Sequence, residues 1–181
     1  MSRGDGTTNQ NPLPLRELLA EDLAAHGGDR TRPGYRALRA HRIGNWRMDL
    51  PTPLRQVAGI VYRRMFRHAR DVLGIELPYA AKLGRRVVIE HQGAIVVHGN
   101  VVMGDDCVIR QGVTLGNKAM DRPMDAPMLG DRVNVGAGAK VLGAVTLGDD
   151  AQVGANAVVV KDVPAGVTVV GIPAKPLPVK A

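Results

Sequence analysis

The chain of 181 residues is poor in aromatic side chains, which make up only 3% of it. Hydrophobic residues still amount to 45%, so a core must be filled mainly with Val, Ile, Leu and Ala. Such a core suits a narrow interior built from identical thin layers better than an ordinary two-layer domain. The length predicts one domain, with at most a small appendage.

Cysteine, long apolar runs and a leader sequence are also scarce or missing. The single cysteine, Cys107, excludes an internal disulfide and is typical of a reducing compartment. No apolar run reaches the roughly 18 residues of a membrane span. The N-terminal residues are polar and lack the apolar centre of a signal peptide. We therefore expect a cytoplasmic protein without a membrane span.

Acidic residues are outnumbered, and the formal net charge is +7. Much of the excess lies in the first 86 residues, in arginine-rich runs at 36–39 and 63–67. A solvated helix face explains these runs most simply, and attraction to a phosphate-bearing ligand or an anionic surface is the alternative. The chain has no stripe of basic and aromatic residues, no zinc-finger spacing and no nucleic-acid motif. Nucleic acid is therefore not an expected partner.

Residues 129–164 repeat every six residues, and a hexapeptide period is the signature of a β-helix. The second position of each block is mostly glycine, and the fifth is small or β-branched. Three short strands and three corners make a turn of 18 residues, in which the first and fifth positions face inward. Each block opens on Leu or Val, at Leu129, Val135, Val141, Leu147, Val153 and Val159.

The same repeat begins earlier, at Leu83, and is interrupted twice. Two additional residues, Val101 and Val102, are expected to shift its register, and residues 117–128 leave the pattern as an extruded loop. Before the repeat, apolar residues at helical spacing predict three helices, at about 15–26, 35–48 and 54–73. The predicted divisions are a mobile N-terminus (1–12), a helical domain (13–76), a β-helix (77–172) and a C-terminal tail (173–181).

His91 is the strongest catalytic candidate. An imidazole titrates near neutral pH and suits general-base chemistry. The third position of its block faces outward, although a surface histidine on a strand would satisfy the same pattern. His98 is the only other histidine in the coils, so no third metal ligand is available and no metal is predicted. The remaining histidines, His26, His41 and His68, are expected on the surface of the helices.

Several motifs carry a resemblance to a known family over about residues 33–177. They are Glu90-His91, the stretch QGVTLG at 111–116, the stretch GAGAKVLG at 136–143 and GIPAK at 171–175. With the hexapeptide blocks and the helical segment before them, they resemble the serine acetyltransferase family of hexapeptide acyltransferases. The resemblance implies a mainly β fold, a left-handed parallel β-helix with an N-terminal α-helical segment. It also implies a homotrimer with active sites between subunits, and direct acetyl transfer from acetyl-CoA.

The resemblance also assigns roles to individual residues. It implies His91 as the general base and Glu76 as the carboxylate that orients it. Residues implied at the acceptor site are Glu90, Gln111 and Asp125. Residues implied for CoA binding are Gly116, Asn117, Gly136, Ala137, Gly154, Ala155, Lys161 and Lys175.

The acceptor motifs depart from the pattern of enzymes that act on serine. Those enzymes carry Asp-His at the catalytic block and Arg-His-Pro in the loop, where this chain has Glu90-His91 and Asp125-Ala126-Pro127. The departures resemble the subgroup associated with colanic-acid-type exopolysaccharide acetylation. The expected acceptor is therefore a hydroxyl of a sugar or polysaccharide precursor. L-serine, for cysteine synthesis, is the alternative, and Glu76 together with His91 argues against a non-catalytic scaffold.

Overall fold

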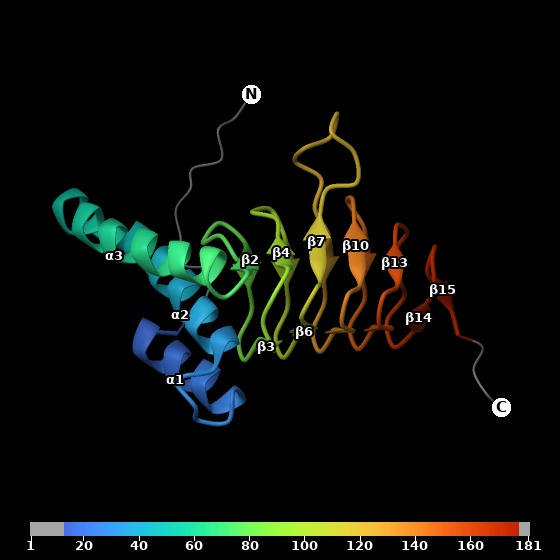
Figure 1. Ribbon diagram of the computed structural model, residues 1–181, viewed down its shortest axis with the longest axis horizontal. Coiled ribbons are helices and arrows are strands. Elements are labelled where there is room, and N and C mark those ends of the chain that lie inside the picture. Colours follow the sequence, from blue (N-terminus) through green and yellow to red (C-terminus); the bar gives the residue numbers. More distant parts are fainter. Residues whose placement is uncertain (1–12, 178–181) are drawn as a thin grey trace.

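The computed structural model describes residues 13–177, in which three helices lead into a long coil of short strands (Figure 1). Residues 1–12 and the last four residues of the predicted tail lie outside this range. The helices are α1 (Leu15–Ala25), α2 (Pro33–Trp46) and α3 (Thr52–Asp71), with a 3-10 helix, η1 (Arg47–Asp49), before α3. No helix in the described range is both long enough and apolar enough to cross a bilayer.

The coil is a parallel β-helix with three faces. Its sheets have the orders β1-β4-β7-β10-β13, β2-β5-β8-β11 and β3-β6-β9-β12-β14-β15, and only β15 is antiparallel to its neighbour. The predicted fold class, a mainly β left-handed parallel β-helix preceded by helices, is confirmed. The strands are β1 (Ile75–Glu76), β2 (Lys82–Leu83), β3 (Val88–Glu90), β4 (Ile95–Val97), β5 (Val102–Met103), β6 (Val108–Arg110), β7 (Thr114–Gly116), β8 (Met128–Leu129), β9 (Asn134–Val135), β10 (Lys140–Leu142), β11 (Thr146–Leu147), β12 (Gln152–Val153), β13 (Val158–Val159), β14 (Thr168–Val170) and β15 (Lys175–Pro176).

The interior of the coil is made of stacked aliphatic side chains. Burial of each such side chain contributes about 1.5–3 kcal/mol to folding. Cys107 also faces the interior. Burial raises the pKa of its thiol to about 11 and keeps it protonated at neutral pH. The best-defined column consists of residues in register and at most 4% exposed, namely Ile89, Ile109, Val135, Val153 and Val169.

Strand register shows where the repeat is interrupted. Asn134 pairs with Gln152, eighteen residues on, as a regular turn requires. Glu90 pairs with Arg110, twenty residues on, whereas Val96 pairs with Thr114, eighteen residues on. The two additional residues must therefore lie between Glu90 and Val96.

The expected position of this insertion, at Val101 and Val102, is wrong. Val101 is fully buried and occupies a regular inward position. The Gly112 N–H donates to the Gly93 carbonyl, 2.9 Å away, so regular spacing has resumed at Gly93. The additional residues are His91 and Gln92, at the corner between β3 and β4.

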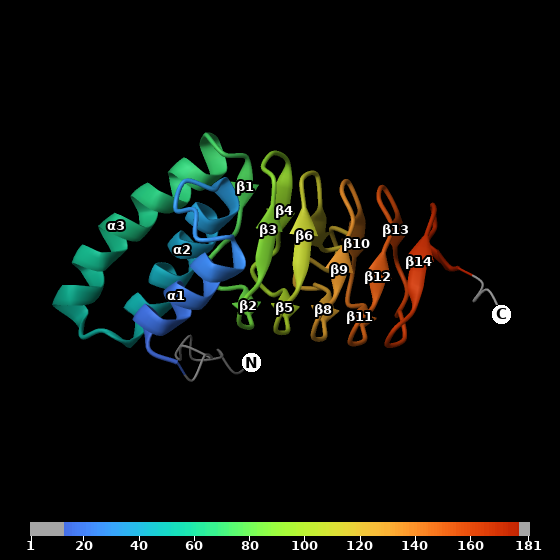
Figure 2. The same cartoon turned by 90° about the horizontal axis from the view of Figure 1, so that it is seen from below.

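The helices cover the first turn of the β-helix and lie at its N-terminal end (Figure 2). Arg42 is 3% exposed and joins three elements through hydrogen bonds to Asp22 (2.8 Å), to the Leu83 carbonyl (2.9 Å) and to the Gly84 carbonyl (2.6 Å). His41 donates from Nε2 to the Ala81 carbonyl at 2.8 Å.

The expectation that the helical histidines lie on the surface is wrong for His26 and His41, each 1% exposed. His26 donates to the Asp22 carbonyl at 2.7 Å and accepts from the Ile89 N–H at 3.3 Å. A neutral imidazole offers one donor and one acceptor, which is what these backbone groups require. Burial of both rings makes them part of the joint between helices and coil.

Gly34 provides a test of how closely α2 approaches the coil. A Cβ at this position would lie 2.0 Å from the Ile89 carbonyl oxygen, which a rigid backbone cannot accommodate. We expect Gly34→Ala to lower the free energy of unfolding by about 2 kcal/mol or more. Gly59→Ala is the matched control on α3, because its Cβ would have no neighbour nearer than 3.6 Å. Urea denaturation should show the control unchanged or slightly stabilised, and an equally stable Gly34→Ala variant would contradict the close approach.

The buried His41 predicts a loss of stability in acid. Burial lowers its pKa from 6.5 to about 3, so the folded protein keeps the ring neutral while the unfolded chain takes up a proton. The stabilisation is complete above about pH 6.5 and is lost as the pH falls toward 3. Urea denaturation from pH 7 to 4 should show this decline, and His41→Gln should make it shallower. An unchanged slope in that variant would show that His41 is not responsible.

Candidate functional site

His91 stands out from the coil because it belongs to the two-residue insertion. It directly follows β3, and its φ of 65° places the backbone in the left-handed region, which turns the chain away from the strand. The side chain is exposed and makes no hydrogen bond within residues 13–177. An imidazole in this setting is available to a ligand or to another subunit.

Glu76 lies on the face of the coil that begins at the same corner. It lies in β1, the edge strand of its sheet. The neighbour of β1 in that sheet is β4, the strand that follows the corner. Gly74 packs against the corner itself, since its carbonyl accepts from the Ile95 N–H at 3.0 Å and an added Cβ would lie 3.1 Å from the Gly93 Cα. The Glu76 carboxylate is exposed, and among the described residues it makes no hydrogen bond to His91.

Glu90 is held by a cation that the sequence patterns did not single out. The Arg110 Nε lies 2.8 Å from Glu90 Oε2, and Arg110 Nη1 donates to the Asn134 side chain. The two residues of the ion pair are aligned across β3 and β6. The sequence would have predicted this pair only if the two-residue insertion had been placed at His91 and Gln92. That placement puts Glu90 and Arg110, twenty residues apart, side by side on the outer face.

Three of the residues assigned to the acceptor and to CoA follow one edge of the coil. Gln111 lies in the corner after β6, and its carbonyl accepts from the Gly138 N–H at 2.8 Å. Ala137 lies above it, and its carbonyl accepts from the Asn156 N–H at 2.8 Å. This places Gln111, Ala137 and Ala155 one above another, beyond the insertion that carries His91.

Gly136 and Gly154 lie next to that edge. The close approach of the next turn of the coil explains why both positions are glycine. A Cβ on Gly136 would lie 2.6 Å from the Ala155 nitrogen, and one on Gly154 would lie 2.6 Å from Val170 Cγ1. Lys175 is exposed in β15 and pairs with Val170, so it belongs to this side of the coil. Lys161 does not join the group, because it follows β13 and lies at a different corner.

The extruded loop spans residues 117–127 and projects from the coil after β7 (Figure 1). Asn100 anchors it by donating to the Met124 carbonyl at 2.9 Å. At the base of the loop, Asn117 donates to the Ala119 carbonyl at 3.0 Å, while Gly116 ends β7. Asp125 is not an isolated carboxylate, since Arg122 Nη1 lies 3.9 Å from its Oδ2. The loop therefore presents charges of both signs.

A hollow of about 200 Å³ separates this loop from the next turn of the coil. Its rim carries two cations and one carboxylate, and its floor is aliphatic. This combination suits a flexible apolar chain that carries polar groups. The lining residues are Lys118, Ala119, Arg122, Asp125, Leu142, Gly143, Ala144, Val145 and Val160.

Backbone N–H groups of the stretch 112–116 are candidates for stabilising the oxyanion that forms during acyl transfer. The N–H groups of Gly112, Val113 and Thr114 instead donate to the carbonyls of Gly93, Arg110 and Ala139. These three amides are therefore committed to the coil. No cluster of three or more His, Cys, Asp or Glu side chains with metal-binding geometry occurs within residues 13–177.

Comparison with known proteins identifies the family. Residues 126–161 match the model described as bacterial transferase hexapeptide (six repeats). A serine acetyltransferase of Helicobacter pylori (strain J99) is 39% identical over 164 residues, covering 89% of this chain and 92% of the relative. The chain belongs to the serine acetyltransferase family of hexapeptide-repeat transferases. A serine acetyltransferase of Synechococcus elongatus is 38% identical, and the match covers 89% of this chain but only 65% of that protein.

Solved structures of family members extend the comparison. The serine acetyltransferase of Neisseria gonorrhoeae in complex with serine gives a TM-score of 0.74 at 29% identity, covering 91% of this chain and 69% of that one. The enzyme of Brucella abortus in complex with coenzyme A gives 0.75 at 27% identity, covering 90% and 67%. These relatives are named for serine, and they give no support to the predicted exopolysaccharide subgroup.

Proposed function

We propose that this family member transfers an acetyl group from acetyl-CoA to the hydroxyl of L-serine. The observation that carries the proposal is the insertion that puts an exposed imidazole at the edge shared by Gln111, Ala137 and Ala155. Relatives over nearly the whole described chain are named for this reaction. The sugar acceptor expected from the sequence has no comparable support among the named relatives.

The proposed chemistry needs one base and no covalent enzyme intermediate. His91 accepts the proton of the serine hydroxyl, and the oxygen attacks the acetyl carbonyl carbon. The carbon–sulfur bond then breaks, and the departing CoA sulfur takes the proton from His91. Glu76, on the other side of the corner, would stabilise the imidazolium that exists between these two transfers.

Two ion pairs, one on the face formed by β3 and β6 and one in the loop after β7, would meet a zwitterionic acceptor together only between two subunits. Glu90 with Arg110, and Arg122 with Asp125, each provide one carboxylate and one guanidinium. An amino acid carries both charges, and a guanidinium can bind a carboxylate through two hydrogen bonds. Arg122 lies beside Asp125, so this carboxylate does not face the serine carboxylate as an uncompensated negative charge.

Acetyl-CoA would lie along the edge that carries Gly136, Ala137, Gly154 and Ala155, with its thioester toward His91. Glycine and alanine allow a pantetheine chain to approach the backbone closely. Lys175 would meet phosphate oxygens on this side, while Lys161, at another corner, would serve a neighbouring subunit or none. We propose that the chain forms a homotrimer with active sites between subunits. In a single chain His91 is exposed and the loop projects from the coil, so a second subunit would complete the walls of the site.

A thiol-release assay with acetyl-CoA tests the reaction and its acceptor together. We expect turnover with L-serine, and little with homoserine or with a panel of sugars and oligosaccharides. His91→Ala should lower kcat/KM for serine by about 10²–10⁴, the usual contribution of a positioned general base. The matched control is Gln92→Ala, which truncates the other residue of the same insertion. Turnover on sugars but not serine would overturn the acceptor, and full activity of His91→Ala would overturn the mechanism.

A further inference from the structure

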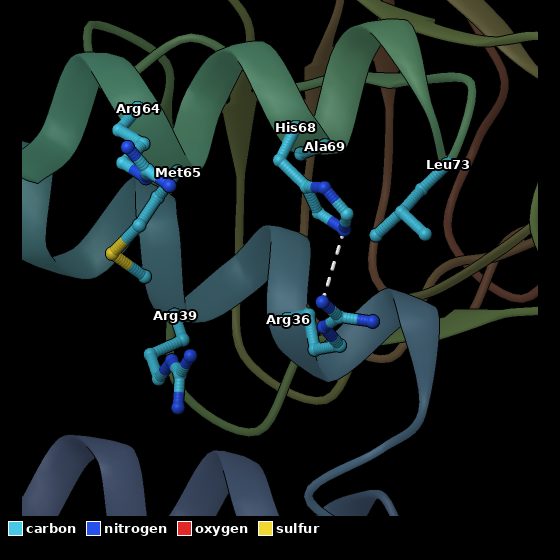
Figure 3. A pocket seen from close by; sticks show the side chains of 7 residues that line it. All are labelled: Arg36, Arg39, Arg64, Met65, His68, Ala69 and Leu73. Atoms are coloured by element: carbon cyan, nitrogen blue, oxygen red, sulfur yellow. Dashed lines mark hydrogen bonds between the residues drawn. The ribbon is translucent and has the colours of Figure 1, made fainter.

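A second hollow lies far from the loop, between α2 and α3, and encloses about 220 Å³. Figure 3 shows Arg36 of α2 and His68 of α3 pointing toward each other, whereas the Arg39 side chain extends from α2 away from α3. Three of the lining residues are apolar and lie along one side of α3 and its exit. The lining residues are Arg36, Arg39, Arg64, Met65, His68, Ala69 and Leu73.

The charge of this hollow is not compensated by the protein. No aspartate or glutamate lines it, and within residues 13–177 none of its three arginines forms an ion pair. Other arginines of the chain behave differently, since Arg42 pairs with Asp22 and Arg110 with Glu90. Like charges gathered on one concave surface raise the local concentration of anions.

The histidine that lines the hollow accepts a hydrogen bond from one arginine but does not neutralise its charge. The distance from Arg36 Nη2 to His68 Nε2 is 2.9 Å, and a guanidinium can only donate. In this contact His68 Nε2 is therefore the acceptor. Three positive charges line the hollow, and one of these arginines, Arg39, has a buried Nε without a hydrogen-bond partner among residues 13–177. A buried donor left without an acceptor is costly, and a bound anion that drew the Arg39 guanidinium toward it would remove that cost.

We propose that this hollow is a binding site for a phosphate-type oxyanion, separate from the acetyl-CoA site. Guanidinium groups offer paired donors that match the oxygen spacing of phosphate, and arginines on two helices can surround one such group. The apolar side formed by Met65, Ala69 and Leu73 limits competing water. The site takes either free phosphate or the phosphate group of a small metabolite.

The position of the hollow links it to the candidate active site. Leu73 lines it, and Glu76 follows three residues later, at the start of the coil. A bound anion would hold α2 and α3 together just before the chain reaches Glu76. We therefore expect occupancy to raise the melting temperature, whatever the acceptor of the transferase proves to be.

Isothermal titration with inorganic phosphate tests the proposal, at constant ionic strength and with saturating CoA to occupy the other phosphate-binding site. We expect saturable binding of one phosphate per chain. The double variant Arg36→Gln/Arg39→Gln should bind about tenfold more weakly or worse, because it loses charge-assisted hydrogen bonds. The matched control is Arg63→Gln/Arg67→Gln, which removes two exposed arginines of α3 that do not line the hollow.

Three results would overturn the site: no saturable binding, an equal loss in both double variants, or binding that disappears when CoA is present. Should the first double variant fold poorly, Arg64→Gln provides the same test, because Arg64 is exposed and its replacement disturbs no packing. Methyl phosphate distinguishes the sources, since tighter binding of this monoester than of inorganic phosphate indicates a phosphorylated metabolite. Weaker binding indicates free phosphate.

Discussion

The fold depends on the hydrogen bonds between successive turns of the coil. Except at the two ends of the coil, each short strand lies against the strand one turn earlier and the strand one turn later, so a residue's position in its block decides whether it faces the core or the outside. A turn of eighteen residues satisfies this requirement without distortion. Any additional residue must leave the stack, and the coil accepts it only at a corner, where the backbone is already turning. His91 with Gln92 is one such departure and the loop at 117–127 is another, whereas the last turn is two residues short, since Gln152 pairs with Thr168, sixteen residues on.

The two ends of the coil must be covered, because an open end exposes unpaired backbone groups. At the N-terminal end, α2 provides the cover, with Arg42 and His41 donating to carbonyls of the first turn. At the C-terminal end, β15 folds back antiparallel on β14. The helices thus stabilise the first turn, in which Glu76 and His91 lie, and the chemistry depends on this joint although no helix residue is assigned to the reaction.

The six-residue period was sufficient to predict the architecture and the inward-facing residues. It could not locate the first insertion, because Ile95 and Val97 are both aliphatic and fit the inward positions of either frame. The apolar pattern of the helices identified their buried faces but not the role of Arg42, since a buried arginine depends on the partner that satisfies it. The pairs Glu90–Arg110 and Arg122–Asp125 were missed because each depends on stacking or on loop conformation.

On the proposed mechanism, departures from the register carry the function while the regular turns carry the stability. Strands before and after the loop pair with a separation of twenty-six residues, as Val108 with Asn134 shows. Removing the eight residues 118–125 therefore restores a regular turn of eighteen. Measuring both the melting temperature and acetyl transfer of this shortened chain tests the claim directly. We expect a melting temperature within a few degrees of the parent and a loss of transfer of about 100-fold or more. Transfer at the parental rate, or a coil that no longer folds, would contradict the account.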